Sequence, residues 1–375
     1  MPIGASEVTG EGYAPARARS AGDRAGRVGA RERDAADSAA PLAGRRGDTG
    51  LAHDERPFVA DRAIRHRRAG SRTLTSVDAH PRDLSGYGRD RPRASWPGEA
   101  RVALSIVLNY EEGAERTVLN GDPESETYLT EIAGAPRPGR DLITESIYAF
   151  GSRVGVWRIL DALEEAGTPA TVFACGQTVE LTPEPVRLAA AQGHEICSHG
   201  YRWFDYDGVD EATERDHIRR TIAAIEAATG TRPVGWYTGR VSMATRRLVA
   251  EEGGFLYDSD DYSDELPFWV EAAGRPHLIV PYTLDANDAR FATPNGFRTA
   301  DDFATYLIDA FEALWREGAT SPGIMNVGLH CRLVGRPGRI DGLRRFLDHV
   351  QSRDGVWVAR RADIARHWIE HHPPA

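Results

Sequence analysis

The sequence predicts an α/β fold in which a parallel sheet curls into a distorted (β/α) barrel. Short apolar runs with the length of buried strands alternate with longer segments whose apolar residues recur at helical spacing. Such alternation is typical of a parallel sheet with helices packed outside it. Seven or eight strand–helix units in one core favour a barrel. An open doubly wound sheet is the alternative, but residues 111–113 lack its glycine-rich fingerprint.

Each element is predicted from its own local pattern. Residues 101–108 form an apolar run after a Pro97-Gly98 turn, which predicts a buried strand. Residues 145–165 carry apolar side chains at helical spacing and are followed by Gly167, which predicts a helix. The remaining predicted strands are residues 170–174, 195–197, 234–236, 255–257, 278–280, 323–329 and 356–358. The remaining predicted helices are residues 185–191, 209–228, 243–252, 299–317, 340–351 and 362–369.

The first part of the chain, residues 1–72, is rich in Arg, Ala, Gly and Asp and has few apolar residues. Such a segment buries too little apolar surface to offset the entropy lost on ordering, so we expect a disordered extension. A targeting peptide is the functional alternative, but Glu32, Asp34 and Asp37 argue against it because targeting peptides are poor in acids. The catalytic domain is expected to span residues 81–370.

Composition excludes several classes of protein. The net charge of -10 implies no basic face for a nucleic acid, and no apolar run approaches a membrane span, so neither partner is expected. All 46 basic residues are arginine; without lysine, the chain cannot form a Walker P-loop, a Schiff base or a carboxylated-lysine metal bridge. Three widely spaced cysteines and the lack of an apolar leader predict a cytoplasmic protein with reduced thiols.

Polar side chains follow several of the predicted strands. They are Glu111, Glu112, His199, Tyr237, Asp258 and His330. In a parallel barrel the carboxyl ends of the strands meet at one rim, where carboxylates beside histidines serve general acid–base hydrolysis or hold a metal. A satisfied loop histidine or a solvated turn is the structural alternative for each of them. Several such ends in one barrel favour a shared site.

Four motifs occur in a fixed order along the chain. They are Asn109-Tyr110-Glu111-Glu112-Gly113, Ser198-His199-Gly200-Tyr201-Arg202-Trp203, Gly235-Trp236-Tyr237-Thr238-Gly239-Arg240 and Val327-Gly328-Leu329-His330. In this order they resemble the motifs of the polysaccharide deacetylase (NodB-homology) superfamily. The resemblance implies a distorted (β/α) barrel of the NodB-homology type. It also implies an acidic pair that supplies a base and a metal ligand, a metal-binding histidine pair, and His330 as the acid.

Three positions depart from the superfamily pattern. Trp203 replaces the second histidine of the metal pair, Tyr237 replaces an arginine, and the acidic pair is glutamate. Only Glu112 and His199 then correspond to metal ligands, and zinc sites normally have at least three from the protein. Because an indole cannot coordinate a metal, Trp203→His is expected to raise zinc affinity.

Longer segments resemble the allantoinase branch of the superfamily, which is linked to urate catabolism. These segments are residues 110–113, 120–122, 199–203, 235–240, 257–260, 281–288 and 329–339. The match runs from about residue 81 to residue 367. This resemblance implies hydrolysis of the cyclic amide of allantoin to allantoate, without a required metal or other cofactor, in a homo-oligomer.

The residues then receive expected roles. Glu111 or Glu112 is the base, with the superfamily motif favouring Glu111. His199 orients water or stabilises the oxyanion, and His330 is the acid. The residues expected to bind allantoin are Trp203, Tyr237, Arg240 and Asp258. Two alternatives are a metal-dependent polysaccharide or peptidoglycan deacetylase, and a barrel that binds a ureide or sugar without turnover.

Overall fold

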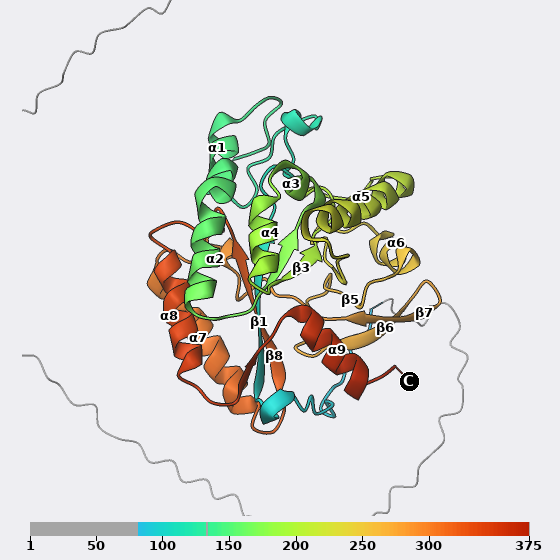
Figure 1. The fold of residues 1–375 in the computed structure, drawn as a ribbon, viewed down its shortest axis with the longest axis vertical. Coiled ribbons are helices and arrows are strands. Elements are labelled where there is room, and N and C mark those ends of the chain that lie inside the picture. Colours follow the sequence, from blue (N-terminus) through green and yellow to red (C-terminus); the bar gives the residue numbers. More distant parts are fainter. Residues whose placement is uncertain (1–81, 133, 375) are drawn as a thin grey trace, which may run out of the picture. The chain divides into compact units, whose positions relative to one another are not determined.

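A computed structural model describes residues 82–132 and 134–374 of the chain. The extension predicted for residues 1–72 lies outside this range. A single nine-stranded sheet runs through the described part, and helices pack against it (Figure 1). Within the same range, no helix combines the length and the apolar composition that a membrane crossing requires.

The sheet is a curled half-barrel. Eight strands follow the hydrogen-bonded order β6-β7-β5-β4-β3-β2-β1-β8, β9 pairs with β1, and only the β6–β7 pair is antiparallel. The strands are β1 Val102–Tyr110, β2 Thr171–Ala174, β3 Glu195–Ser198, β4 Gly235–Trp236, β5 Tyr257–Asp258, β6 Phe268–Ala272, β7 Arg275–Ile279, β8 Gly323–His330 and β9 Val356–Val358. The nearly sequential order lacks the central reversal of a doubly wound sheet, so the predicted distorted barrel is confirmed.

The central strand is β1, because it has three neighbours. β8 pairs with it in register from Val102↔Gly323 to Asn109↔His330. On its other edge β9 pairs with residues 102–104 and β2 with residues 107–110. The first strand along the chain, β1, is therefore paired with the last two strands, β8 and β9.

Nine α-helices are present in the described range. They are α1 Leu142–Phe150, α2 Val156–Glu165, α3 Gly176–Leu181, α4 Glu184–Ala191, α5 Glu211–Thr229, α6 Thr245–Glu252, α7 Ala300–Glu317, α8 Ile340–Gln351 and α9 Arg361–His371. The predicted helix at residues 145–165 is in fact α1 and α2 joined by a π-helical segment, Gly151–Gly155. A Cβ atom at Gly155 would collide with the carbonyl oxygen of Cys331, so this close approach requires glycine.

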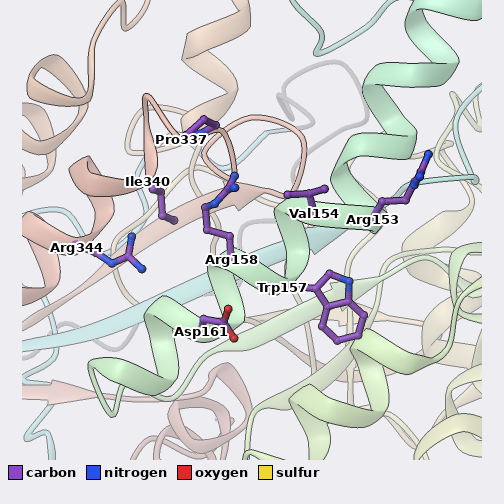
Figure 2. A pocket seen from close by; sticks show the side chains of 8 residues that line it. All are labelled: Arg153, Val154, Trp157, Arg158, Asp161, Pro337, Ile340 and Arg344. Carbon is purple, nitrogen blue, oxygen red and sulfur yellow. The ribbon is translucent and has the colours of Figure 1, made fainter. Parts of the chain in front are cut away.

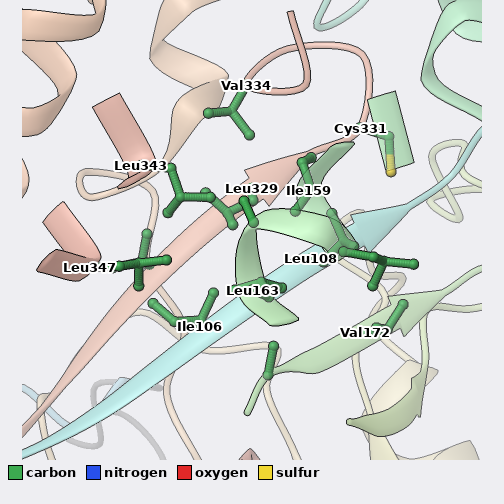
Figure 3. Packing of buried hydrophobic residues seen from close by; sticks show 14 of the residues in the cluster. Ile106, Leu108, Ile159, Leu163, Val172, Leu329, Cys331, Val334, Leu343 and Leu347 are labelled. Carbon is green, nitrogen blue, oxygen red and sulfur yellow. The ribbon is translucent and has the colours of Figure 1, made fainter. Parts of the chain in front are cut away.

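Side-chain alternation along β1 builds two cores. Residues 102, 104, 106 and 108 face the helices and join a cluster that includes Ile159 of α2 and Leu343 of α8 (Figure 3). Residues 103 and 107 face the other way and join Phe173 and Trp368. The interior of the half-barrel is therefore a packed apolar core. Polar residues lie at its rim, where the carboxyl ends of the strands meet.

Two elements were missed by the sequence analysis. The β6–β7 hairpin turns at Ala273 and Gly274, both in the left-handed region with φ of 51° and 70°. Only the end of β7 was predicted, because β6 is half-exposed and carries no run of buried residues. The short helix α3 begins at Gly176, a residue that normally argues against a helix.

Candidate active site

Strand alternation brings four of the predicted residues to one rim. Val107 on β1 and Cys197 on β3 belong to the inner core. Continuing the period of two past each of these strands places the next polar side chains on the same inner side. The neighbouring strands β4 and β8 contribute one residue each. The four are Glu111, His199, Tyr237 and His330.

Glu111 lies between the two imidazoles. Its Oε1 is 3.1 Å from Nε2 of His199 and 3.6 Å from Nε2 of His330. All three side chains are buried. Burial alone would raise the pKa of Glu111, but Arg332, His330 and His199 together lower it from 4.5 to about 2. Glu111 is therefore an anion at neutral pH.

His330 is oriented by Asp288, which was not among the predicted site residues. Asp288 Oδ1 is 2.6 Å from Nδ1 of the His330 ring, and its Oδ2 accepts the backbone N–H groups of His330 and Val334. Burial lowers the pKa of His330, but the charges of Glu111 and Asp288 outweigh it and raise the pKa above 6.5. These contacts favour the protonated imidazole.

Arg332 is the second residue that the sequence analysis did not place in the site. Its Nη1 is 2.8 Å from Oε2 of Glu111 and 3.5 Å from Oε1 of Glu112. Nε donates to the carbonyl of Leu129 at 3.0 Å. Burial lowers the pKa of Arg332, but nearby anions including Glu111 raise it well above its usual value, so the guanidinium is charged.

Glu112 points away from the histidines. Its Oε2 accepts the backbone N–H of Glu111 at 3.1 Å, and its Oε1 lies so close to Gly151 that a Cβ atom there would collide with it. Burial, with the charge of Glu111, raises the pKa of Glu112 despite Arg332. The two glutamates that are adjacent in sequence therefore have different surroundings, because successive side chains leave the strand end on opposite sides.

Trp203 and Arg240 lie together at the edge of the cluster. The Trp203 ring stacks on Tyr128, with 5.5 Å between ring centroids. The Arg240 guanidinium lies 5.4 Å from the Trp203 ring and 5.2 Å from the Tyr128 ring. Both of its terminal nitrogens donate to the carboxylate of Glu126. Trp203 is buried, whereas Arg240 is partly exposed and Tyr128 is exposed, so this cation and the Tyr128 ring could contact a polar ligand.

Tyr237 and Asp258 have different placements. The Tyr237 ring is 4.8 Å from the His199 ring, so Tyr237 lies in the cluster. Asp258 instead receives hydrogen bonds from Arg246 at 3.1 Å and from His277 at 2.8 Å. The structure does not bring Asp258 to the cluster: it ends β5 on the side that faces α6, and its carboxylate is already paired there.

The donor set at this rim does not fit the metal of the superfamily. Trp203 stacks on Tyr128 at the position of the second histidine, and Glu112 is turned toward Arg332 and not toward His199. Among residues 82–132 and 134–374, no group of three or more His, Cys, Asp or Glu side chains is arranged to hold a metal ion. A zinc ion normally needs three protein ligands.

Two hollows lie outside the cluster. A shallow one of about 500 Å³ lies between α2 and the start of α8, and it is lined by residues that include Arg153, Trp157 and Arg344 (Figure 2). None of its eight lining residues belongs to the acid–base cluster. A larger one of about 1410 Å³ runs beside β6 and includes Tyr262 and Tyr282. Both tyrosines contact Tyr237, so this hollow adjoins the candidate site from the open side of the half-barrel.

The Glu111 carboxylate lies between two buried imidazoles, and Asp288 holds one of them. This arrangement is typical of a hydrolase that works by proton transfer. The comparisons with known proteins agree. Residues 148–254 match the family model described as polysaccharide deacetylase. A protein of Schizosaccharomyces pombe, provisionally named polysaccharide deacetylase, is 44% identical over 313 residues, which are 78% of this chain and 98% of the relative. The chain therefore belongs to the polysaccharide deacetylase family.

Two solved structures are similar over the same part of the chain. A probable polysaccharide deacetylase from Pseudomonas aeruginosa is 55% identical, with a TM-score of 0.77 over 79% of this chain and 100% of that one. A structure named PuuE allantoinase is 52% identical, with the same TM-score and the same coverage of both chains.

Proposed function

We propose that this protein is an allantoinase, which opens the cyclic amide of allantoin to give allantoate in purine catabolism. The observation that carries the proposal is the buried cluster of Glu111, His199 and His330, at a rim whose donor set does not fit a metal ion. Similarity to the PuuE allantoinase, at 52% identity, supports the same substrate.

The reaction makes three demands on the site. Water must lose a proton as it adds to the ring carbonyl carbon, the resulting oxyanion must be stabilised, and the ring nitrogen must gain a proton as its bond to carbon breaks. The products are then a carboxylate and an open-chain ureido group. Water supplies the hydroxyl group on carbon and the hydrogen on nitrogen, and the new carboxylic acid releases its proton to solvent, so the hydrolysis balances without a further reactant.

We assign the pair Glu111–His199 as the base. Glu111 is ionised and lies 3.1 Å from Nε2 of His199, so a proton released by water can pass to the pair. We assign His330 as the acid, since Glu111 and Asp288 favour its protonated form over the effect of burial. The 3.6 Å between its Nε2 and Glu111 is too long for a hydrogen bond, which leaves Nε2 to protonate the ring nitrogen.

Three further residues are assigned to binding. Trp203 and Tyr237 supply aromatic faces beside the acid–base groups, and Arg240 supplies a fixed donor for a carbonyl oxygen. Allantoin is small and polar, with a flat ring and several carbonyls, and such ligands suit aromatic walls with a few placed donors. A cytoplasmic location and a homo-oligomeric state are part of the same proposal.

The test compares two substrate classes on one preparation. Purified protein is incubated with racemic allantoin, and separately with N-acetylglucosamine oligomers, with and without an exhaustive chelator treatment. We expect allantoate to form at the same rate in both conditions, and no acetate to be released. Acetate release that depends on added metal, without allantoate, would instead support the metal-dependent deacetylase activity. Failure to turn over either substrate would favour a binding role.

A further inference from the structure

The guanidinium of Arg332 lies where two buried carboxylates need a positive charge. A single nitrogen, Nη1, is 2.8 Å from Glu111 and 3.5 Å from Glu112. The Arg332 side chain is fully buried, with 0% of its surface exposed. Two adjacent buried carboxylates repel each other strongly unless a cation lies close to both. A divalent ion shared by these carboxylates would have to displace this guanidinium.

Aromatic rings enclose the guanidinium. Its central carbon is 4.3 Å from the Tyr148 ring centroid and 5.0 Å from that of Trp203. Nη2 has no hydrogen-bond partner in the described part of the chain. The guanidinium is therefore held by two carboxylates, one carbonyl and two ring faces, and not by a complete set of hydrogen bonds. Trp203, which replaces a metal-binding histidine of the superfamily, forms one wall of this enclosure.

We propose that Arg332 is the built-in cation of this site: it holds the two glutamates in place and keeps a divalent metal ion out. Arg332 is a positioning residue, because it acts on the reaction through Glu111. The inference concerns the same site as the proposed function and rests on it for the activity measurement. The metal-binding measurement needs no substrate and is independent of it.

One expectation from the sequence changes as a result. The sequence alone predicts that Trp203→His raises zinc affinity, because it restores a histidine pair. With Arg332 still between the carboxylates, we expect Trp203→His alone to gain no zinc site. The double variant Trp203→His/Arg332→Ala should gain one, since it restores the ligand and also removes the competing cation.

The experiment measures zinc binding by titration calorimetry on chelator-treated, full-length protein. The variants for zinc binding are Trp203→His and the two double variants Trp203→His/Arg332→Ala and Trp203→His/Arg332→Met, and the single variants Arg332→Ala and Arg332→Met are used for activity. Arg336→Ala is the matched control, because Arg336 is on the same segment but lies over Phe150 and near Glu131. We expect about one zinc per chain in the two double variants, which have the restored histidine and lack Arg332, and none in the wild type, Trp203→His or Arg336→Ala.

Chemical rescue by free guanidinium distinguishes the loss of the positioning role of Arg332 from a loss of folding. Arg332→Ala leaves a space of guanidinium size, whereas methionine fills it. Millimolar guanidinium chloride should therefore displace zinc from Trp203→His/Arg332→Ala but not from Trp203→His/Arg332→Met. It should also restore part of the lost activity of Arg332→Ala toward allantoin, but not that of Arg332→Met. The proposal is overturned if wild type or Trp203→His binds one zinc per chain, or if the double variants bind no more zinc than wild type. If the Arg332 variants do not fold, the test rests on Trp203→His alone, and the absence of bound zinc in that variant supports the proposal.

Discussion

Asp288 holds His330 through both its ring and its backbone: one carboxylate oxygen lies 2.6 Å from the ring Nδ1, and the other accepts the backbone N–H at 2.8 Å. A carboxylate on Nδ1 fixes the tautomer of the imidazole and directs Nε2 toward the substrate side. Asp288 ends the segment 281–288 and begins the 3-10 helix Asp288–Ala292, so this loop contributes to the candidate active site as well as connecting β7 to α7.

Asp288→Asn should lower kcat and move the alkaline limb of the pH profile to lower pH. The charge of Asp288 raises the pKa of His330, so removing that charge lets His330 lose its catalytic proton at a lower pH. The measurement is kcat for allantoin across pH 5 to 10. Asp285→Asn, at an exposed aspartate of the same loop, is the control and should leave the limb in place. An unmoved limb in Asp288→Asn would show that His330 is not the acid.

His199→Ala and His330→Ala should each lower kcat by roughly 10²-fold or more, the usual effect of losing an acid–base group. His349→Ala is the control, since His349 pairs with Glu312 on the surface helices. Steady-state kinetics on folded variants checks the prediction. Near-normal turnover in either site variant would remove that histidine from the mechanism.

Glu111→Gln should cost both activity and stability. The amide keeps the size of the side chain but removes the charge that faces Arg332, and breaking a buried ion pair costs about 3 kcal/mol. This differs from the sequence alone, which gives no reason for a large loss of stability. Urea denaturation and kcat are measured together. If Glu111→Gln lowers kcat by ~10² without a shift in the denaturation midpoint, the ion pair contributes little to folding.

Arg240→Ala should raise KM for allantoin more than it lowers kcat. Arg240 is held by Glu126 beside Trp203, away from the acid–base groups, so its loss removes binding that substrate and transition state share. Arg247→Ala is the control, because Arg247 makes surface ion pairs with Glu211 and Glu251. A fall in kcat with KM unchanged would place Arg240 in the chemical step instead.

Deleting residues 1–70 should leave folding and activity intact. Every strand and helix of the described structure lies after residue 96, and the deleted segment is poor in apolar residues. Thermal denaturation and allantoin turnover of the truncated protein, compared with the full chain, test this. Insoluble or inactive truncated protein would give the segment a structural role.

Much of the fold was predictable because most strands and helices of this chain have a clear local pattern of apolar residues. The run at residues 101–108 became β1, and the helical pattern near residue 340 became α8. The π-helical break between α1 and α2 was not predicted, because Gly151 is needed only where Glu112 packs against it and Gly155 only where Cys331 does. That reason is visible in the tertiary structure and not in the local sequence.

The site was predictable in part for the same reason. Glu111, His199 and His330 could be found as polar ends of apolar runs. The partner Asp288 could not, because its role depends on which residues meet across the rim. Glu112 and Glu111 look equivalent in sequence, and only the alternation at the end of β1 separates them. Arg332 follows His330 closely, so a charged residue just past a catalytic histidine was an available signal.

The position of β1 has a consequence for how the protein is made. This strand is synthesised long before its partners β8 and β9, which lie much further along the chain. Pairing between segments so distant in sequence slows folding and leaves strand edges open in the meantime. We therefore expect the sheet to close only after β8 and β9 have been synthesised. Since Glu111 follows β1 and His330 ends β8, a prematurely released chain would lack the sheet and the catalytic cluster together.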